Sequence, residues 1–546
     1  MAQPLPFPDG VPAPQGVPSV LPTAELGGLV EAAVLEVLAQ HPAHQVPHPR
    51  QMFVNRNLRM DRIEAIGFDM DYTLAIYHRR AIEELSFDMT LAKLVRERGY
   101  SPNIGNIKYD QQFVIRGLVV DREAGNLFKM DRFGHVGRAY HGRRRLDDEE
   151  RYKLYREEKI KLSSERYAWI DTLFALPEAC LYSEIIELLE ADGQKLDYGK
   201  LYDDIRECID TVHRDGSLKA EIRKDIGRFI FKDPDLATTL HKLRSGGKKL
   251  FVATNSLWDY TDAVMKYLLD GVLAEYPSWR NYFDAVIVGA SKPAFFSEAR
   301  PFLEVDIATG VTTTKEPEQF ERAHAYQGGN LPRFEQLFHV HGEKVLYVGD
   351  HIYGDILRSR KSSLWRTCLI VQELEDEVAY TDQHLDNVHR LADLEMLRDR
   401  LGDEVNQHKL TLNALERKLD RRELETHART LAEAERKTSK SELDVLRKAL
   451  KDVTRQADEL ESAVETGFNR YWGLLFKEGN ENSRFGEQVE QYACVYTSRV
   501  SNFLPYSPTQ YFRSPREAMP HERGNALTGR LSPYGSEGPP KGAEAD

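Results

Sequence analysis

Two aspartates, Asp69 and Asp71, stand two residues apart directly after the mostly apolar run from Ile63 to Phe68. Like charges at this spacing repel each other, so the arrangement is unfavourable unless a cation or a reaction makes use of it. An ionised carboxylate can attack phosphorus, and a carboxyl crowded by negative charge can hold a proton for a leaving alkoxide. The pair predicts phosphoryl transfer with Asp69 as nucleophile and Asp71 as acid and base, although a lone pair of this kind is more often a turn or a solvated helix start.

Other reactive side chains follow further short apolar runs of the chain. They are Thr254 and Asn255 after residues 248–253, Lys292 just past residues 285–289, and Asp350 and Asp355 after residues 344–349. Four carboxylates at one place cannot all stay ionised without a cation, and an all-oxygen ligand set suits a hard divalent ion. We therefore expect Mg²⁺ here, with Lys292 and the Thr254 hydroxyl offsetting the charge of the transferring phosphoryl group.

The elements that precede these side chains must bring them together. Short apolar runs recur at residues 63–68, 248–253, 285–289, 344–349 and 365–371, and helix-like stretches separate most of them. Near-continuous apolar strands that alternate with helices are typical of a parallel sheet covered on both faces. The prediction is a doubly wound, Rossmann-like α/β domain, in which ligands bind at the carboxyl ends of the strands.

Two long stretches interrupt or follow this pattern. Residues 80–235 are expected to form a largely helical cap inserted after the first strand. Residues 388–466 carry two heptad seams, which predict an antiparallel coiled-coil hairpin with about 30 residues per arm. The seams are Leu394, Leu397, Leu401, His408, Leu412, Leu415 and Leu419 in one arm and Leu443, Leu446, Leu450, Val453, Ala457, Leu460 and Val464 in the other. We interpret them as structural, packing on the same chain or against another subunit.

The remaining boundaries follow from composition. Residues 1–22 and 523–546 are rich in Pro and Gly and are predicted to be disordered tails. Residues 23–79 hold the N-terminal segment and the first core strand, residues 236–387 continue the core, and residues 467–522 are expected to pack on it.

Charge and composition bound the class of protein. The chain has 546 residues, 41% of them hydrophobic, and a formal net charge of −13, so it can bury a large core and repels polyanions. The basic triplet Arg143–Arg145 is followed at once by acids, and we interpret residues 141–161 as a solvated helical face. The four cysteines are far apart, which argues against a disulfide framework or a zinc site. Since neither a signal peptide nor a membrane span is recognisable, we expect a cytoplasmic protein with no nucleic-acid or membrane partner.

The ordered motifs carry a resemblance to known proteins. The motifs "DMDYT" (69–73), "TNS" (254–256), "SKP" (291–293) and "GDHIYGD" (349–355) occur in the order and strand-end context of the haloacid dehalogenase superfamily of phosphatases. The longer stretches "FDMDYTLAIY", "TNSLWDYTDAVMKYL", "VLYVGDHIYGDILRSRK" and "MPHE" (519–522) resemble the cytosolic purine 5′-nucleotidases that prefer IMP and GMP. The resemblance runs from about residue 50 to residue 522 and weakens through the hairpin.

This resemblance implies roles for individual residues. Asp69 would be the nucleophile and Asp71 the acid and base, and Mg²⁺ would be held by Asp69, the backbone carbonyl of Asp71, and Asp350, with Asp355 supporting it from nearby. The phosphate would be bound by Thr254, Asn255, Ser256, Lys292 and Lys219, and the nucleoside by Phe174, Arg206, Asp210 and His213. Without the resemblance, Phe174 would be read as a core aromatic and Arg206 with Asp210 as an ordinary i,i+4 ion pair.

The sequence also departs from the animal enzymes that it resembles. Ala175 stands where they carry an asparagine near the base, and Leu162 and Asp171 stand where they carry an arginine and an asparagine of a nucleotide effector site. Their long acidic C-terminal tail is missing. Activation by ATP-like effectors is therefore not expected from the resemblance.

The sequence thus predicts a Mg²⁺-dependent 5′-nucleotidase for IMP and GMP that works through an aspartyl-phosphate, which could pass its phosphoryl group to a nucleoside as well as to water. We expect a homo-oligomer, either a dimer or a tetramer. One alternative is the same chemistry on another small phosphomonoester, such as a sugar phosphate. The other is a catalytically idle coiled-coil scaffold, against which the intact set of Asp69, Asp71, Lys292 and Asp350 argues.

Overall fold

The computed structural model describes residues 46–156, 160–314, 316–357, 363–420 and 425–515, and the tails predicted at residues 1–22 and 523–546 lie outside these ranges, as does the "MPHE" motif. The described chain divides into two compact units. Residues up to Tyr380 together with Asn469–Ser514 form one unit, and Thr381–Phe468 belong to the other. Each unit is described by itself below.

The first unit is built on a sheet with nine strands among the described residues. In spatial order the strands are β1 (Phe53–Val54), β19 (Val495–Thr497), β16 (Arg366–Ile370), β15 (Val345–Gly349), β3 (Ala65–Phe68), β11 (Lys249–Ala253), β12 (Ala285–Val288), β14 (Ala325–Gly328) and β13 (Phe302–Val305). The strands from β19 to β14 are parallel to one another, and the two edge strands β1 and β13 run antiparallel. All five predicted apolar runs are parallel strands of this sheet, so the predicted α/β fold class is confirmed.

The order of the strands locates the ligand crevice. From β3 the chain proceeds outward through β11, β12 and β14 on one side, and then continues through β15, β16 and β19 on the other side. The direction of winding therefore reverses at β3. In open parallel sheets, ligands bind at the carboxyl ends of the strands next to such a reversal. Asp69 follows β3 at this point.

Alternate side chains of the central strands fill two separate cores, which explains why these strands are apolar throughout. Leu250 and Val252 of β11 join the core beneath α9 (Leu236–Ser245) and α10 (Trp258–Leu269). Phe251 joins the opposite core, which includes α11 (Leu331–Phe338). The Phe251 ring lies across Gly67 of β3, where a Cβ would come within 2.1 Å of the ring. Only glycine fits at this place in the middle of the sheet.

The insertion after β3 contains helices, as predicted, and also a five-stranded antiparallel sheet that the sequence did not reveal. The helices are α3 (Arg79–Arg98), α4 (Asp148–Tyr155), α5 (Leu176–Ala191), α6 (Tyr198–Arg214), α7 (Ser217–Lys224) and α8 (Ile226–Phe229). The sheet has the order β8 (Arg144–Arg145), β7 (Val136–His141), β6 (Asn126–Met130), β5 (Val119–Asp121) and β9 (Tyr167–Trp169). The ribbon of β4 (Ile76–Tyr77) and β10 (Ile230–Phe231) pairs the two ends of the insertion.

The basic triplet does not lie on a helix, so this part of the prediction is wrong. Arg144 and Arg145 form β8, and α4 begins only at Asp148. The Asp147 side chain caps that helix by accepting from the Glu150 amide, and this start signal fixes the helix after the arginines. Arg143 pairs with Asp110 and Glu184, so its charge is used within the fold.

The C-terminal segment returns to the first unit. It contributes β17 (Lys477–Glu478), β18 (Glu481–Asn482), α16 (Arg484–Tyr492), β19 and β20 (Tyr511–Phe512), which pairs with β2 (Leu58–Arg59). Helix α13 (Leu374–Gln383) leads out of this unit. The four cysteines are buried and none forms a disulfide.

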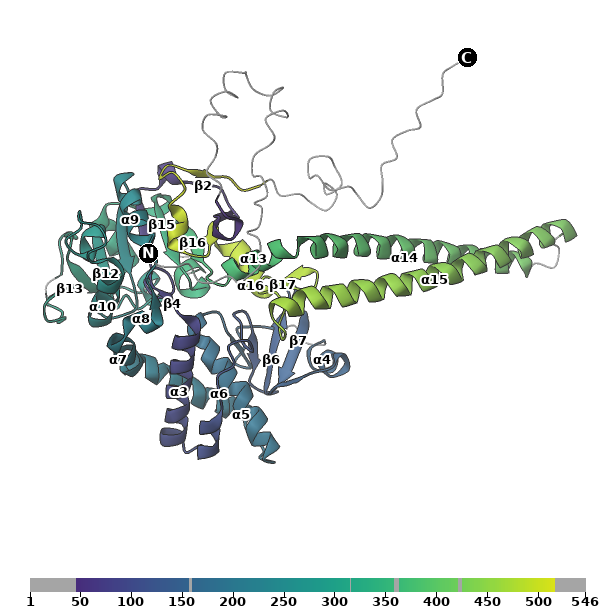
Figure 1. Cartoon of the computed structure of the whole chain (residues 1–546), viewed down its shortest axis with the longest axis horizontal. Coiled ribbons are helices and arrows are strands. Elements are labelled where there is room, and N and C mark those ends of the chain that lie inside the picture. The colour runs from purple at the N-terminus through teal and green to yellow at the C-terminus, as the bar shows by residue number, and fades with distance from the viewer. Residues whose placement is uncertain (1–45, 157–159, 315, 358–362, 421–424, 516–546) are drawn as a thin grey trace, which may run out of the picture. The chain divides into compact units, whose positions relative to one another are not determined.

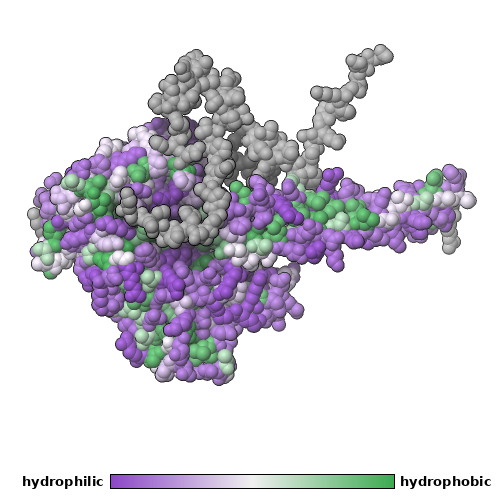
Figure 2. Space-filling model, viewed as in Figure 1, coloured by the Kyte–Doolittle hydropathy of each residue, from purple (hydrophilic) through white to green (hydrophobic). Residues whose placement is uncertain are grey.

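The second unit is an antiparallel helical hairpin of α14 (Leu385–Leu419) and α15 (Thr426–Phe468), which lie side by side in Figure 1. A hydrogen bond of 3.0 Å between His408 Nδ1 and Ser439 Oγ fixes the register of the arms. One seam position was wrong, because Leu397 is 44% exposed while Val405 is buried in its stripe. Figure 2 shows further hydrophobic residues on the hairpin surface. None of the described helices combines the length and apolar run needed to cross a bilayer.

Candidate active site

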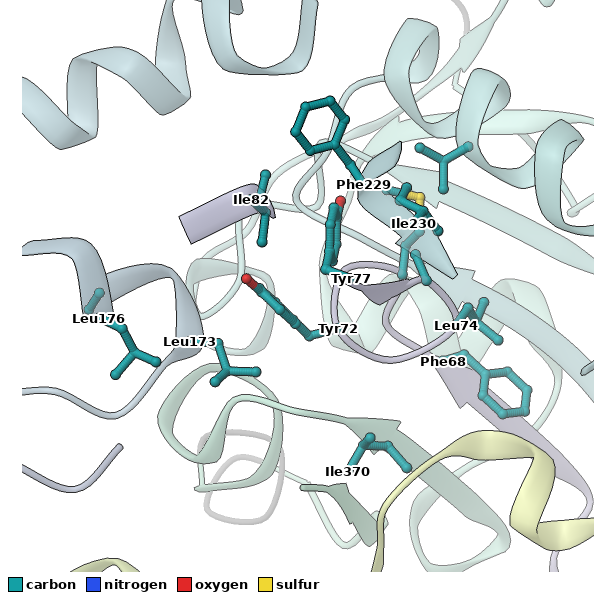
Figure 3. Packing of buried hydrophobic residues seen from close by; sticks show 14 of the residues in the cluster. Phe68, Tyr72, Leu74, Tyr77, Ile82, Leu173, Leu176, Phe229, Ile230 and Ile370 are labelled. Atoms are coloured by element: carbon teal, nitrogen blue, oxygen red, sulfur yellow. The ribbon is translucent and has the colours of Figure 1, made fainter. Parts of the chain in front are cut away.

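The loop after β3 presents Asp69 at the centre of the sheet edge. The Asp69 amide still bonds to the carbonyl of Val348 on β15 at 2.9 Å, so its position is fixed by the sheet. The chain then turns sharply, with the Ala75 amide donating to the Met70 carbonyl at 2.9 Å and Tyr72 at φ 55°. A left-handed tyrosine is strained and persists only where the surroundings hold it. Figure 3 shows Tyr72 between Leu173 and Leu176 of the insertion on one side and Tyr77 of β4 on the other.

Lys292 joins the carboxylates that the sequence predicted at this edge. Its Nζ lies 3.0 Å from Asp69 Oδ1 and 2.6 Å from Asp355 Oδ1, and it donates to the Tyr347 hydroxyl at 2.9 Å. The Tyr347 hydroxyl in turn donates to the Ala253 carbonyl at 2.9 Å. The lysine is buried and contacts residues just after β3, within β15 and in the turn after β15, so its charge is held at one place.

Three of the aspartates could share a metal ion. One carboxylate oxygen each of Asp69, Asp350 and Asp355 lies within 4.8 Å of the other two. Burial raises the pKa of Asp69 well above its ordinary value, and the neighbouring carboxylates add to this effect while Lys292 opposes it. Burial raises the pKa of Asp350 to about 7, and the negative charge of Asp355 is the second largest cause of this rise. The residues fit a hard divalent cation, because the donors are all oxygens and one lysine leaves their negative charge uncompensated.

Gly349 makes room for the third of these carboxylates. A Cβ at position 349 would lie 2.5 Å from Asp355 Oδ2. The carboxylate therefore folds back over the backbone at the end of β15, where the His351 amide donates to Asp355 Oδ2 at 3.3 Å. The absence of a side chain at Gly349 is what places Asp355 beside Lys292.

Both carboxylate oxygens of Asp71 accept hydrogen bonds from hydroxyl groups. Tyr77 of the ribbon donates to Oδ1 at 2.6 Å, and Ser256 donates to Oδ2 at 2.7 Å. Since the single phenolic proton of Tyr77 goes to Asp71, the Tyr260 hydroxyl, 2.7 Å from that of Tyr77, must donate to it. Lys219 Nζ donates to the Ser256 hydroxyl at 3.1 Å. Two chains of hydrogen bonds thus converge on Asp71 and fix its orientation.

The loop after β11 holds the backbone of Lys292 and Ser256 in place and also faces the site. Asn255 accepts from the Lys292 amide at 2.6 Å and donates to the Lys292 carbonyl at 2.9 Å, so its side chain clasps the lysine backbone. The Thr254 hydroxyl is buried and accepts from the Ser256 amide at 3.1 Å. Thr254 and Asn255 thereby shape the loop that presents Lys292 and Ser256.

A cavity of about 240 Å³ opens over these residues. The predicted site residues that line it are Asp69, Asp71, Asp350, Asn255, Ser256, Lys219, Phe174 and His213. Lys292, Asp355 and Thr254 do not line the cavity, but each contacts a residue that does, namely Asp69, His351 and Ser256 respectively. The insertion supplies Phe174, His213 and Lys219, and the sheet edge supplies the others.

Aromatic rings from the insertion line one wall of the cavity. The Phe174 ring meets the rings of Tyr72 and His213 edge to face, with centroids 4.6 Å and 5.3 Å away. His213 Nδ1 is 2.9 Å from the Ile209 carbonyl and so carries the proton, while Nε2 is buried with no hydrogen-bond partner among the described residues. Burial lowers the pKa of His213, which favours this neutral form. His213 Nε2 is therefore an acceptor for a donor group of a ligand.

Arg206 and Asp210 do not line the cavity. They precede His213 on α6, and both side chains are about half exposed, at 50% and 49%. Arg206 Nη1 donates to the fully buried Glu178 at 2.8 Å, and its Nε lies 3.6 Å from Asp210 Oδ2. The ion pair that the sequence suggested is present, with Glu178 as its unpredicted third member.

Tyr77, Tyr260, Thr172 and His351 line the cavity but were not predicted as site residues. Three of them stand inside the quoted motifs, Tyr77 at the end of "FDMDYTLAIY", Tyr260 within "TNSLWDYTDAVMKYL" and His351 within "GDHIYGD". Burial would lower the pKa of His351, but Asp171, 3.0 Å from its Nε2, raises it to about 9. A polar residue within a strand-end motif was thus an available signal for these three.

The chain is similar in sequence to known proteins. The sequence profile described as the 5′ nucleotidase family matches residues 52–524. A 5′-nucleotidase domain-containing protein of Dictyostelium discoideum is 31% identical over 482 residues, covering 87% of this chain and 75% of that protein. A solved 2-haloacid dehalogenase of Pseudomonas syringae is 17% identical and covers 56% of this chain and 86% of its own, with a TM-score of 0.19.

Proposed function

Because the chain belongs to the 5′ nucleotidase family, and is thereby a phosphoric monoester hydrolase that acts on nucleotides, we propose that it is a Mg²⁺-dependent enzyme that prefers IMP and GMP. One observation carries the proposal. Asp69, Asp350 and Asp355 meet beside Lys292, and two of these aspartates line a cavity together with Asp71 and the aromatic ring of Phe174.

We assign the attack on phosphorus to Asp69 Oδ2, because Oδ1 receives the Met70 amide at 2.7 Å and lies next to Lys292. The new P–O bond to Asp69 forms while the bond from phosphorus to the nucleoside O5′ breaks, and Asp71 gives O5′ its proton. A water then attacks the aspartyl-phosphate, loses a proton to Asp71 and releases phosphate. Lys292 beneath the cavity and Lys219 at its wall offset negative charge on the phosphoryl group.

Mg²⁺, when bound by Asp69, Asp350 and the backbone carbonyl of Asp71 with Asp355 nearby, would supply further charge neutralisation. The oxygen-only donor set and the shortage of positive charge support this assignment.

The base preference rests on the insertion. Stacking against Phe174 favours a purine by its larger face but does not separate hypoxanthine from adenine. Arg206 and Asp210 do not line the cavity but precede His213 on the same helix. For a base that extends to them, Arg206 only donates and Asp210 only accepts, which suits O6 and N1–H of a 6-oxopurine and mismatches adenine. The bare Nε2 of His213 adds one more acceptor at the wall of the cavity.

The test is phosphate release from IMP, GMP, AMP, UMP and a set of sugar phosphates, each with Mg²⁺ and with a chelator. We expect turnover only with Mg²⁺ and kcat/KM highest for IMP and GMP. Faster hydrolysis of a sugar phosphate than of any nucleotide would contradict the proposed substrate.

The vacated nucleoside side also supports phosphotransfer. If inosine binds there before water attacks, its O5′ can take the phosphoryl group from Asp69. Incubation of IMP with labelled inosine should place label in the nucleotide, and hydrolysis of IMP without any labelled nucleotide would contradict this step.

We also propose that the enzyme is a cytoplasmic homo-oligomer, a dimer or tetramer. Four buried free cysteines suit a reducing compartment, and the hydrophobic residues exposed on the hairpin offer contact area. Light scattering of the purified chain and cell fractionation test the two statements.

A further inference from the structure

Arg116 belongs to the insertion, but its side chain ends among residues of the first unit that follow β15 and β16. It lies in the segment before β5, is fully buried, and its guanidinium carbon is 5.0 Å from the centroid of the Phe485 ring. A cation at such depth must have each of its donors satisfied.

The guanidinium makes three hydrogen bonds in two directions. Nε and Nη2 donate to the two carboxylate oxygens of Glu373 at 2.9 Å and 2.6 Å. Nη1 donates to the backbone carbonyl of Asp350 at 3.1 Å. Burial would raise the pKa of Glu373, but Arg116 and Arg79 hold it below its ordinary value, so the pair is charged.

The residue before Glu373 holds the loop of the nucleophile. Gln372 Nε2 donates to the carbonyl of Tyr72 at 3.2 Å, at the left-handed turn that follows Asp71. Residues 372 and 373 therefore bind the Asp69 loop directly and the Asp350 loop through Arg116. This short segment therefore links the two loops beyond the ends of β3 and β15.

A contribution to folding stability would not by itself explain why Arg116 and Glu373 form a buried ion pair. Replacing a buried ion pair by apolar side chains of similar volume is often neutral or stabilising, because both charges lose their hydration. Residues that hold metal ligands from behind, by contrast, commonly change metal affinity by about 10- to 100-fold when they are altered.

We propose that Arg116 and Glu373 are positioning residues that fix the Asp350 carboxylate relative to Asp69 and thereby set the affinity for the divalent ion. This inference rests on the proposed metal dependence. Neither residue lines the cavity, so they act through Asp350 and not on the substrate.

Arg116→Lys is the sharpest variant, because lysine keeps the charge but cannot reach both acceptors with a planar fork. Arg244 offers a matched control. Its Nη1 donates to Asp284 at 2.8 Å and to the Tyr282 carbonyl at 2.9 Å, just before the start of β12 and so at the opposite edge of the sheet. Arg244→Lys removes the same kind of fork away from the metal loop.

The measurement is binding of Mn²⁺, followed by the EPR signal of the free ion and by competition with Mg²⁺, on the full chain without substrate. Arg116→Lys should bind Mn²⁺ at least about tenfold more weakly than wild type, and Arg244→Lys should bind it as wild type does. Excess Mg²⁺ should restore turnover of IMP by Arg116→Lys.

Wild-type affinity in Arg116→Lys, or equal weakening in both lysine variants, would overturn the inference while leaving the proposed function intact. Failure of the wild type to bind either ion would overturn both. If Arg116→Lys does not fold, the double variant Arg116→Met with Glu373→Leu removes both charges together, and the same weakening of Mn²⁺ binding is expected of it.

Discussion

The residues proposed to act on the phosphate and those proposed to contact the base differ in how firmly the fold holds them. Asp69, Lys292 and Asp355 are buried, and the lysine contacts both carboxylates directly. Arg206 and Asp210 stand on one helix of the insertion and are half exposed. The proposed reaction therefore rests on groups that the sheet holds, whereas the proposed base preference rests on a few side chains that one substitution can rearrange.

The largest expected effect is on the phosphate side. Asp69→Asn removes the nucleophile while keeping its size, so turnover of IMP should fall at least about 10³-fold. Phosphate release measures it, and Asp61→Asn, at an exposed aspartate that pairs only with Arg59 among the contacts described, is the control. Undiminished hydrolysis by Asp69→Asn would exclude the covalent mechanism.

Tyr77→Phe tests whether Asp71 acts as the acid. Loss of the hydroxyl frees Asp71 Oδ1, and kcat for IMP should fall by about 10- to 100-fold. p-Nitrophenyl phosphate has a leaving group that needs little protonation, so its kcat should fall much less. Tyr260→Phe, one hydrogen bond further away, should cost less than Tyr77→Phe on IMP. Equal losses on both substrates would instead indicate a general loss of structure.

A substitution among the residues proposed to contact the base is expected to change the preference between nucleotides and not the maximal rate. Asp210→Asn replaces an acceptor by a group that also donates, so the ratio of kcat/KM for IMP to that for AMP should fall by about tenfold. kcat for IMP at saturation should stay near the wild-type value. Equal kcat/KM for IMP and AMP in the wild-type enzyme would refute the base-reading role of Arg206 and Asp210.

The smallest effect on chemistry is expected from the hairpin. Removing about residues 400–460 takes away no predicted site residue, so kcat/KM should stay within about twofold of wild type while the oligomeric state or the thermal midpoint changes. Activity assays and light scattering on the shortened chain measure this. A variant that keeps its fold and quaternary state but loses turnover would show that the hairpin takes part in catalysis.

The contrast between residues that follow the strands and residues on a helix of the insertion also explains which site residues the sequence could predict. Asp69, Thr254, Lys292 and Asp350 follow apolar runs, and parallel strands bring such positions together whatever the intervening length. Glu178 escaped prediction, because nothing local shows that a buried carboxylate 28 residues away pairs with Arg206.

Short or shifted patterns were also hard to read. The strands of the insertion are only two to six residues long, so helical signals around them dominated the interpretation. In the hairpin, Leu397 is hydrophobic but exposed, whereas Val405 is buried because it stands four residues after Leu401 and three before His408 in the heptad repeat. Hydrophobicity was a weaker guide there than spacing.

The space at Gly349 has a consequence for how mutations of this enzyme would be interpreted. Even alanine would push its methyl group into Asp355, so the position tolerates no side chain, although glycine itself offers no reactive group. In a screen of all single substitutions scored by activity, residue 349 would be as intolerant as an aspartate that touches the substrate. Intolerance to mutation at this strand end therefore marks the steric frame of the site as well as its chemistry.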